Sequence, residues 1–131
     1  MPFLSWIHST YAGVDHVLCP EIVDNPDIML TNAKGVFSSS LAEYVIQACM
    51  YFAKDIPRLL QQQKDKIWYK FPVTELKGRT MGIIGYGDIG RACARLAKPF
   101  GMRTLGLRRN PTLSEHDKLI DEVRELIPFI F

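Results

Sequence analysis

Residues 80–90 read TMGIIGYGDIG, and this stretch decides the fold. Its first five residues predict a short strand, and the six that follow form a GxGxxG pattern. Apolar residues then recur with helical period as far as Phe100, and Gly101 stands where a helix-ending glycine is expected. A second strand is predicted over 103–107. The region is therefore a βαβ unit of about 30 residues, whose strands should be parallel.

The GxGxxG pattern has the context of a dinucleotide-binding fingerprint, because a strand precedes it, a helix opens inside it and a second strand follows. Gly85 permits the tight turn, Gly87 lets a pyrophosphate approach the backbone, and Gly90 lets the helix lie against the strand. The phosphates would lie on the free N–H groups at the positive end of the helix. The alternative interpretation is a glycine-rich turn that binds no ligand.

Two arginines follow the second strand, where NAD-preferring sites carry an acidic residue for the ribose 2′-hydroxyl. Arg108 and Arg109 occupy that place, 18 and 19 positions after Gly90. A guanidinium pairs with a phosphate both by charge and by bidentate geometry. We therefore expect NADP(H) to be favoured over NAD(H). The alternative is a solvated arginine pair at the end of a strand.

The composition is that of an ordinary globular chain of about one domain. Its 131 residues are 47% hydrophobic and 23% charged, which argues against intrinsic disorder. Sixteen basic and fourteen acidic residues give a net charge of +2, so nothing favours nucleic-acid binding. No apolar stretch approaches the ~20 residues of a membrane-spanning helix. The three cysteines and three histidines are scattered, which favours reduced thiols, no metal site and a cytoplasmic location.

The region before residue 78 predicts shorter elements. Strands are expected over 3–7 and 28–31, with a short helical piece over 14–18 between them. The loop at 9–13 consists mainly of small and hydroxyl residues.

A longer helix follows, with an apolar stripe that runs from Leu41 to Ile56. Ser40 and Glu43 form a capping-box pattern at its start, and Pro57 should end or kink it. A polar helical segment then leads to IWYKFP at 67–72. Its aromatic residues either pack on their own domain or form a subunit contact.

Three stretches together resemble the D-isomer-specific 2-hydroxyacid dehydrogenases, a family that includes hydroxypyruvate/glyoxylate reductases and phosphoglycerate dehydrogenases. They read STYAGVDH at 9–16, NAKGV at 32–36 leading to LAE at 41–43, and ELKGRTMGIIG at 75–85. The resemblance covers residues 3–123. It implies an α/β, Rossmann-like fold, a parallel sheet with flanking helices, in an incomplete two-domain dehydrogenase.

The resemblance also assigns parts of the chain to two domains. Residues 1–78 would be a partial substrate domain with the interdomain helix and a dimerisation arm, and 79–131 a partial NAD(P)-binding domain. The main-chain amides of Ala12 and Gly13 would hold the substrate carboxylate, although a loop without a ligand is the alternative. The fingerprint, with Asp88 and Ile89, would contact the pyrophosphate: Gly85, Gly87, Asp88, Ile89 and Gly90.

The implied activity is the NAD(P)-dependent reduction of a small 2-keto acid of the hydroxypyruvate/glyoxylate class, by a homodimeric full-length protein. The family's catalytic Arg, Glu and His lie beyond the fingerprint, so we expect a chain truncated at both ends that holds no catalytic residue. His8, His16 and His116 do not match the catalytic position. The alternative is a non-catalytic nucleotide-binding or dimerising fragment, or a gene-model fragment without a stable fold. An organelle address is the alternative to the cytoplasm.

The truncation would leave one strand edge and one apolar face of the sheet open. We therefore expect weak nucleotide affinity, marginal stability and a tendency to associate. The apolar tail at 126–131 departs from the family pattern.

Overall fold

The computed structural model describes residues 3–125 and divides into two compact units, Met1–Phe37 and Ser38–Phe131. No helix of the described part is long and apolar enough to cross a bilayer. The fold is the expected α/β arrangement of parallel sheets with flanking helices. The domain division between residues 78 and 79 stays a prediction.

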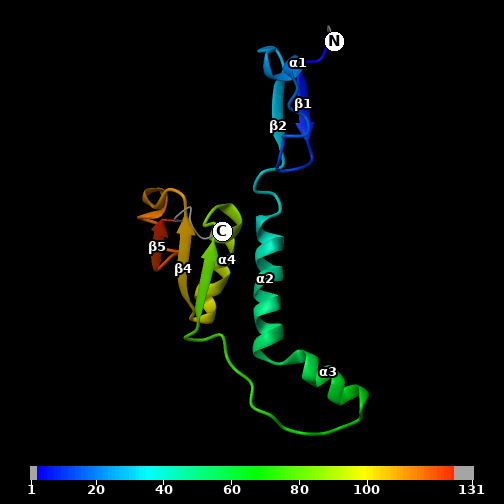
Figure 1. Ribbon diagram of the computed structural model, residues 1–131, viewed down its shortest axis with the longest axis vertical. Coiled ribbons are helices and arrows are strands. Elements are labelled where there is room, and N and C mark those ends of the chain that lie inside the picture. Colours follow the sequence, from blue (N-terminus) through cyan, green and yellow to red (C-terminus); the bar gives the residue numbers. More distant parts are fainter. Residues whose placement is uncertain (1–2, 126–131) are drawn as a thin grey trace. The chain divides into compact units, whose positions relative to one another are not determined.

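The first unit is a two-stranded parallel sheet with a single helical turn (Figure 1). Strand β1 (Trp6–Ser9) pairs with β2 (Met29–Asn32), and α1 (Pro20–Val23) lies between them in the chain. The predicted strand at 28–31 is thus shifted by one residue, and the one at 3–7 begins and ends later than expected.

The helix predicted over 14–18 is wrong. That segment is a turn, closed by hydrogen bonds from the N–H groups of Val17 and Leu18 to the carbonyl of Val14, at 2.8 and 3.2 Å. The helical turn forms at Pro20 instead, because the fixed φ of proline suits a first helical position.

The second unit begins with two helices, α2 (Ser38–Ala53) and α3 (Ile56–Lys64). Ser40 lies inside α2, so the predicted capping box is wrong. Gly35 closes the preceding turn with a φ of +85°, and the helix starts three residues after it. Pro57 does not kink α2, which ends before it; it lies in the first turn of α3, where its missing N–H costs nothing.

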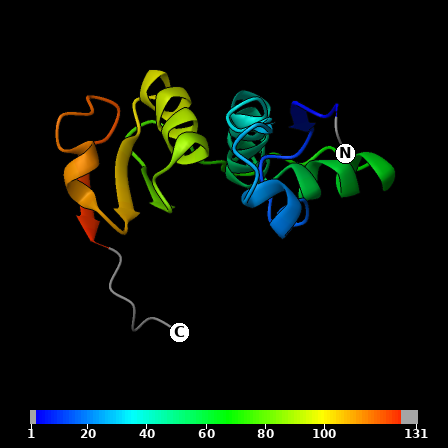
Figure 2. The same ribbon diagram turned by 90° about the horizontal axis from the view of Figure 1, so that it is seen from above.

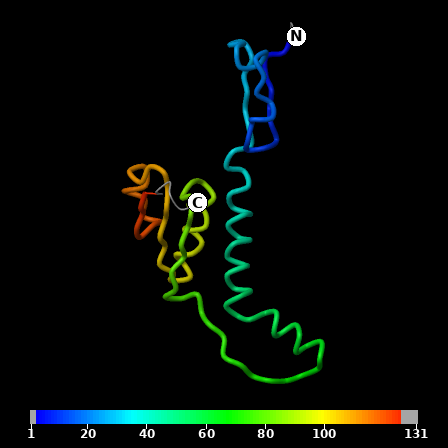
Figure 3. The backbone as a smooth tube through the Cα atoms, viewed as in Figure 1, coloured from blue at the N-terminus to red at the C-terminus, as the bar shows by residue number. Residues whose placement is uncertain are grey.

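The aromatic segment after α3 has no regular secondary structure and leads back to the sheet (Figure 3). The Arg58 guanidinium of α3 lies 4.2 Å from the centre of the Phe71 ring and 5.8 Å from that of Tyr69, so two aromatics of this segment pack on their own unit. Trp68 is 92% exposed. Packing on the same unit therefore accounts for Phe71 but not for Trp68.

The sheet of the second unit is parallel throughout, in the order β3-β4-β5. Strand β3 (Thr80–Ile84) has the predicted bounds, and β4 (Arg103–Arg108) ends one residue later than predicted. Between them run α4 (Asp88–Ala97) and the short 3₁₀ helix η1 (Lys98–Phe100), closed by Gly101 with a φ of +69°. The predicted βαβ unit is confirmed.

Two elements follow β4, and sequence reasoning missed both. They are the 3₁₀ helix η2 (Pro111–Ser114) and strand β5 (Glu122–Glu125). The sequence of β5, EVRE, has the composition of a solvated segment. It is a strand because its backbone pairs with β4, from Leu105 opposite Glu122 onward.

The core of the second unit lies where α4 packs against α2 and the sheet, with α4 along one sheet face (Figure 2). Ala94 and Ala97 of α4 are completely buried, and their small side chains allow close approach. The buried cluster comprises Ala42, Ile46, Met81, Cys93, Ala97 and Met102.

The opposite sheet face carries an apolar hollow of about 390 Å³, lined mainly by residues of β3 and β4. Ile84 on this face is 77% exposed. Its partner across the strands is Leu107, which also lines the hollow. The expectation of an open apolar face is confirmed for the described residues.

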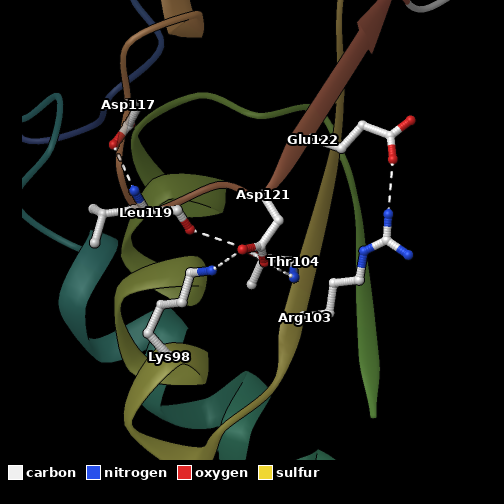
Figure 4. Close-up of polar contacts among 7 residues, drawn as sticks. All are labelled: Lys98, Arg103, Thr104, Asp117, Leu119, Asp121 and Glu122. Atoms are coloured by element: carbon white, nitrogen blue, oxygen red, sulfur yellow. Dashed lines mark hydrogen bonds and ion pairs between the residues drawn. The ribbon is translucent and has the colours of Figure 1, made fainter. Parts of the chain in front are cut away.

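Asp121 fastens the segment between β4 and β5 to the sheet (Figure 4). Its Oδ2 accepts a hydrogen bond of 2.7 Å from the N–H of the fully buried Thr104, and its Oδ1 lies 2.6 Å from the Lys98 ammonium. The hydroxyl of Thr104 donates to the Leu119 carbonyl at 3.0 Å. The Lys98 contact first, and then the Thr104 N–H, lower the pKa of Asp121 to about 2.

Replacing this carboxylate tests its contribution to stability. We expect Asp121→Asn to lower the free energy of unfolding by about 1 kcal/mol at pH 7, because the variant loses the ion pair with Lys98. The expected loss is small because solvent partly screens this pair in the wild type. The folded-state pKa lies below the ordinary value of 3.8, so the advantage of the wild type is present above pH 4 and is lost as the pH falls to 2. Urea unfolding of both proteins from pH 7 to 2 measures this difference. A gap that does not change with pH would contradict the assignment.

Candidate functional site

The turn between β3 and α4 is fastened to the neighbouring strand. Gly85 has a φ of +91°, which a residue with a side chain adopts only under strain. The N–H groups of Gly85 and Tyr86 both donate to the carbonyl of Leu107 in β4, each at 2.9 Å. The turn is therefore held at the carboxyl edge of the parallel sheet, where open α/β sheets bind ligands.

The first turn of α4 presents unpaired backbone donors. Gly87 is its N-cap, and the N–H of Arg91 bonds the Gly87 carbonyl at 2.8 Å. The N–H groups of residues 88–90 consequently have no intrahelical acceptor. A Cβ added to Gly87 would meet no atom of the described chain within 4 Å. Glycine at this position is thus not required by the packing of the chain itself.

Gly90 is required by packing. A Cβ at this position would lie 2.8 Å from the Gly85 carbonyl oxygen and 2.8 Å from Cγ2 of Ile83. Its absence allows α4 to approach β3 closely, which is the role that the sequence predicts for the third glycine.

A hollow of about 430 Å³ opens beside this turn. It brings together Gly87, Asp88 and Arg108, three of the predicted cofactor residues. Four others do not line it: Gly85, Ile89, Gly90 and Arg109. The lining residues that the sequence did not single out for cofactor binding come from the β3–α4 turn, α4, η2 and the loop after η2: Tyr86, Arg91, Thr112, Leu113, Ser114, His116 and Asp117.

The two predicted arginines differ in their surroundings. Arg108 is half-buried in the hollow, where its guanidinium donates to the hydroxyl of Ser114, a residue only 4% exposed. Arg109 is exposed and lies outside the lining. The structure therefore brings Arg108 to the site and leaves Arg109 at its margin.

Asp117 contributes a carboxylate to the hollow, but its charge is already paired. Its Oδ2 accepts hydrogen bonds from Nε of Arg91 at 2.6 Å and from the Tyr86 hydroxyl at 3.1 Å. Its Oδ1 accepts from the N–H of Leu119 at 3.1 Å. Burial alone would raise the pKa of Asp117, but these donors outweigh it and the pKa is lowered.

Tyr86 is the complementary partner of this carboxylate. It is 2% exposed, and burial followed by the contact with Asp117 raises its pKa to about 12. The hydroxyl is therefore a neutral hydrogen-bond donor at neutral pH. Sequence reasoning missed both residues. Tyr86 occupies the variable position of the GxG pattern, which does not indicate this role. Asp117 lies 26 positions from Arg91, so spacing does not predict their contact.

The predicted substrate loop belongs to the first unit. Ala12 and Gly13 follow β1 and are exposed. The Ala12 carbonyl accepts a hydrogen bond of 2.7 Å from the side chain of Asn32 in β2, which fixes the loop. Within the described part of the chain, the N–H groups of Ala12 and Gly13 donate to no acceptor.

The histidines, cysteines and carboxylates of residues 3–125 form no group of three that could hold a metal ion. His116 lies on the wall of the hollow and is exposed. The arrangement provides backbone donors, a polar wall and two arginines, of which Arg91 is paired with Asp117 and Arg108 is not paired with a carboxylate, and this suits a phosphorylated ligand.

Comparison with known proteins agrees with this geometry. Residues 46–128 match the family model described as D-isomer specific 2-hydroxyacid dehydrogenase, NAD binding domain. D-3-phosphoglycerate dehydrogenase of Homo sapiens is 39% identical over 94 residues, which cover 64% of this chain and 18% of that enzyme. The chain thus spans about a fifth of the length of this relative.

Solved structures also resemble the chain, including the following two. A D-isomer specific 2-hydroxyacid dehydrogenase family protein from Aeromonas salmonicida matches with a TM-score of 0.75 and 37% identity, over 94% of this chain and 38% of that one. The NADPH-dependent glyoxylate/hydroxypyruvate reductase of Sinorhizobium meliloti, solved with NADP and sulfate, matches with a TM-score of 0.68 and 25% identity, over 97% and 38%.

The family model spans more than half of the chain, and it contains the fingerprint turn, α4 and the hollow described above. The chain therefore belongs to the D-isomer specific 2-hydroxyacid dehydrogenases and carries part of their NAD-binding domain.

Proposed function

We propose that the chain binds a nicotinamide dinucleotide at the β3–α4 turn, as part of an NAD(P)-dependent reductase of small 2-keto acids of the hydroxypyruvate/glyoxylate class. One observation carries this proposal: Gly87 leaves open space directly before the unpaired N–H groups of α4, and Arg108 lines the same hollow. Open space beside free donors fits a phosphate that approaches the backbone.

The pyrophosphate would be held by main-chain groups of the fingerprint. Gly85 and Gly90 shape the turn, while Gly87, Asp88 and Ile89 contribute the backbone that faces the phosphates. Asp88 acts through its N–H, because its carboxylate would repel a phosphate. When bound, the nicotinamide supplies the hydride for reduction of the keto group.

The adenosine end favours NADP(H) over NAD(H) for an electrostatic reason. The guanidinium of Arg108 faces the hollow and keeps donors free, since Ser114 takes only one contact and a guanidinium has five N–H groups. Two carboxylates line the hollow: Asp117 is paired with Arg91, and Asp88 is the first residue of α4, at the pyrophosphate end of the proposed site. The ribose 2′-phosphate would therefore meet positive charge, and Arg109 adds to it from the margin of the site.

The substrate would be a small 2-keto or 2-hydroxy acid. The exposed N–H groups of Ala12 and Gly13 are suited to bind its carboxylate, because the adjacent carbonyl is anchored by Asn32. The names of the relatives support the chemical class while differing in the acid: one is a phosphoglycerate dehydrogenase and another a glyoxylate/hydroxypyruvate reductase.

A homodimer, joined through the aromatic segment at 67–72, is the second part of the proposal. The observation in its favour is the exposure of Trp68, a side chain that buries a large area when it finds a partner. Binding and dimerisation without catalysis by this chain is the alternative function. The reduced cysteines favour the cytoplasm as its compartment.

Two glycine variants separate ligand binding from folding. Gly87→Ala places its methyl group in open space, so we expect unfolding free energy within about 0.5 kcal/mol of the wild type and at least a roughly tenfold weaker affinity for NADPH. Gly90→Ala places its methyl group 2.8 Å from backbone, so we expect a clear loss of stability. Calorimetric titration and urea unfolding measure both properties. Full NADPH affinity in a folded Gly87→Ala protein would contradict the proposed site.

The arginines provide a test of the cofactor preference. We expect Arg108→Met to weaken NADPH binding roughly tenfold and to change NADH binding less than twofold, because only NADPH carries the 2′-phosphate. Arg109→Met is the matched control at the margin of the hollow and should show a smaller effect. Titration of each variant with both nucleotides measures the preference. Equal losses for the two nucleotides would show that Arg108 does not select NADP(H).

A further inference from the structure

We propose that Tyr86 and Asp117 are positioning residues, which hold the loop after β4 against the fingerprint turn and thereby set the preference for a 2′-phosphorylated dinucleotide. The inference rests on the proposed function and extends it to two residues that do not follow from the glycine pattern. It is carried by a continuous series of contacts from the turn to Arg108.

The series begins at the ring of Tyr86, which is built into the base of the turn. A Cβ added to Gly106 of β4 would lie 3.2 Å from Cβ and Cγ of Tyr86, and also 3.2 Å from Cδ1 of Ile120. The missing side chain of Gly106 therefore makes room for the ring. With 2% exposure, the ring has little freedom to move, and its hydroxyl is held in one place.

The carboxylate of Asp117 connects three parts of the unit. It accepts from the Tyr86 hydroxyl of the turn and from Nε of Arg91 in α4, while its other oxygen accepts from Leu119 of its own loop, a contact visible in Figure 4. Buried and charged partners make such hydrogen bonds stronger than neutral ones. The loop is therefore fastened to the turn and to the helix at the same residue.

The series continues to Arg108 through η2. The N–H of Asp117 donates to the Ser114 carbonyl at 3.0 Å, and the Ser114 hydroxyl accepts from the guanidinium of Arg108. Ser114 is 4% exposed, so its hydroxyl has a fixed position. If Asp117 leaves its place, Ser114 moves with it and the Arg108 guanidinium loses the contact that orients it.

This arrangement predicts an effect on selectivity rather than on binding in general. The pyrophosphate is held by the turn, which is tied independently to Leu107 of β4. Only the 2′-phosphate depends on the orientation of Arg108. Loosening the loop should therefore weaken NADPH binding and leave NADH binding largely unchanged.

Tyr86→Phe is the direct test, because it removes the hydroxyl and keeps the buried ring. We expect a roughly fivefold weaker NADPH affinity and less than a twofold change for NADH, measured by calorimetric titration of the full chain. Tyr44→Phe is the matched control; Tyr44 is 71% exposed on α2, and we expect no change with either nucleotide. Ser114→Ala removes the hydroxyl that contacts Arg108, at the other end of the same series, and should shift the ratio of the two dissociation constants in the same direction.

In the double variant with Tyr86→Phe and Ser114→Ala, the ratio of the NADPH and NADH dissociation constants should change no more than in the stronger single variant. Both substitutions act on Arg108 through the same series of contacts. Equal losses for NADPH and NADH in the folded single variants would overturn the inference alone, because a general structural role predicts that result. If the wild type binds neither nucleotide, the proposed function fails, and the inference with it. Thermal unfolding of each variant establishes that it is folded, and Ser114→Ala decides the matter if Tyr86→Phe does not fold.

Discussion

The backbone donors at the start of α4 are the constraint on which the second unit depends. Three N–H groups at a helix N-terminus need an acceptor, and the helix itself cannot supply one. The turn before them is open at Gly87, takes a positive φ at Gly85 that glycine adopts without strain, and is closely packed at Gly90. Glycine is thus suited to each of the three positions for a different physical reason. Together the three glycines bring an exposed helix terminus to the edge of a parallel sheet.

Two aspartates hold the remainder of the unit in relation to that terminus. Asp121 fastens the approach to β5 through Thr104 and Lys98, away from the hollow. Asp117 fastens the loop beside the hollow through Tyr86 and Arg91. Both pKa values are lowered, so both residues are ionised under ordinary conditions. The segment between β4 and β5 has little regular structure. The side-chain contacts of Asp117 and Asp121 hold it in place where a strand would be held by backbone hydrogen bonds.

The sequence predicts best those features that rest on local periodicity or on a required backbone conformation. The bounds of β3, the position of α4 and the closure at Gly101 follow from the apolar pattern and the glycines. It fails where the deciding contact is distant. Strand β5 has the composition of a solvated segment, because what makes it a strand is its backbone pairing with β4. Helix α2 begins at Ser38, before the Ser40 capping pattern.

The residues of the candidate site also fall into those that the sequence predicts and those that depend on distant contacts. The turn and Arg108 can be inferred from spacing, because the end of a strand and the start of a helix are fixed by the βαβ unit. The network of Tyr86, Arg91 and Asp117 cannot, since it joins positions up to 31 residues apart through side chains. The difference between Arg108 and Arg109 also needs the structure, because Arg108 is oriented by the hydroxyl of Ser114 in η2, a contact that spacing does not predict.

The most direct measurement is an amide NMR titration of the full chain with NADPH, following the backbone N–H resonance of each residue. The account predicts that the largest shifts fall on residues 87–90 at the start of α4, with smaller shifts around Arg108 and η2. Saturable binding whose shifts fall elsewhere, for example on α3 and the aromatic segment, would contradict it, as would a folded chain whose spectrum does not change.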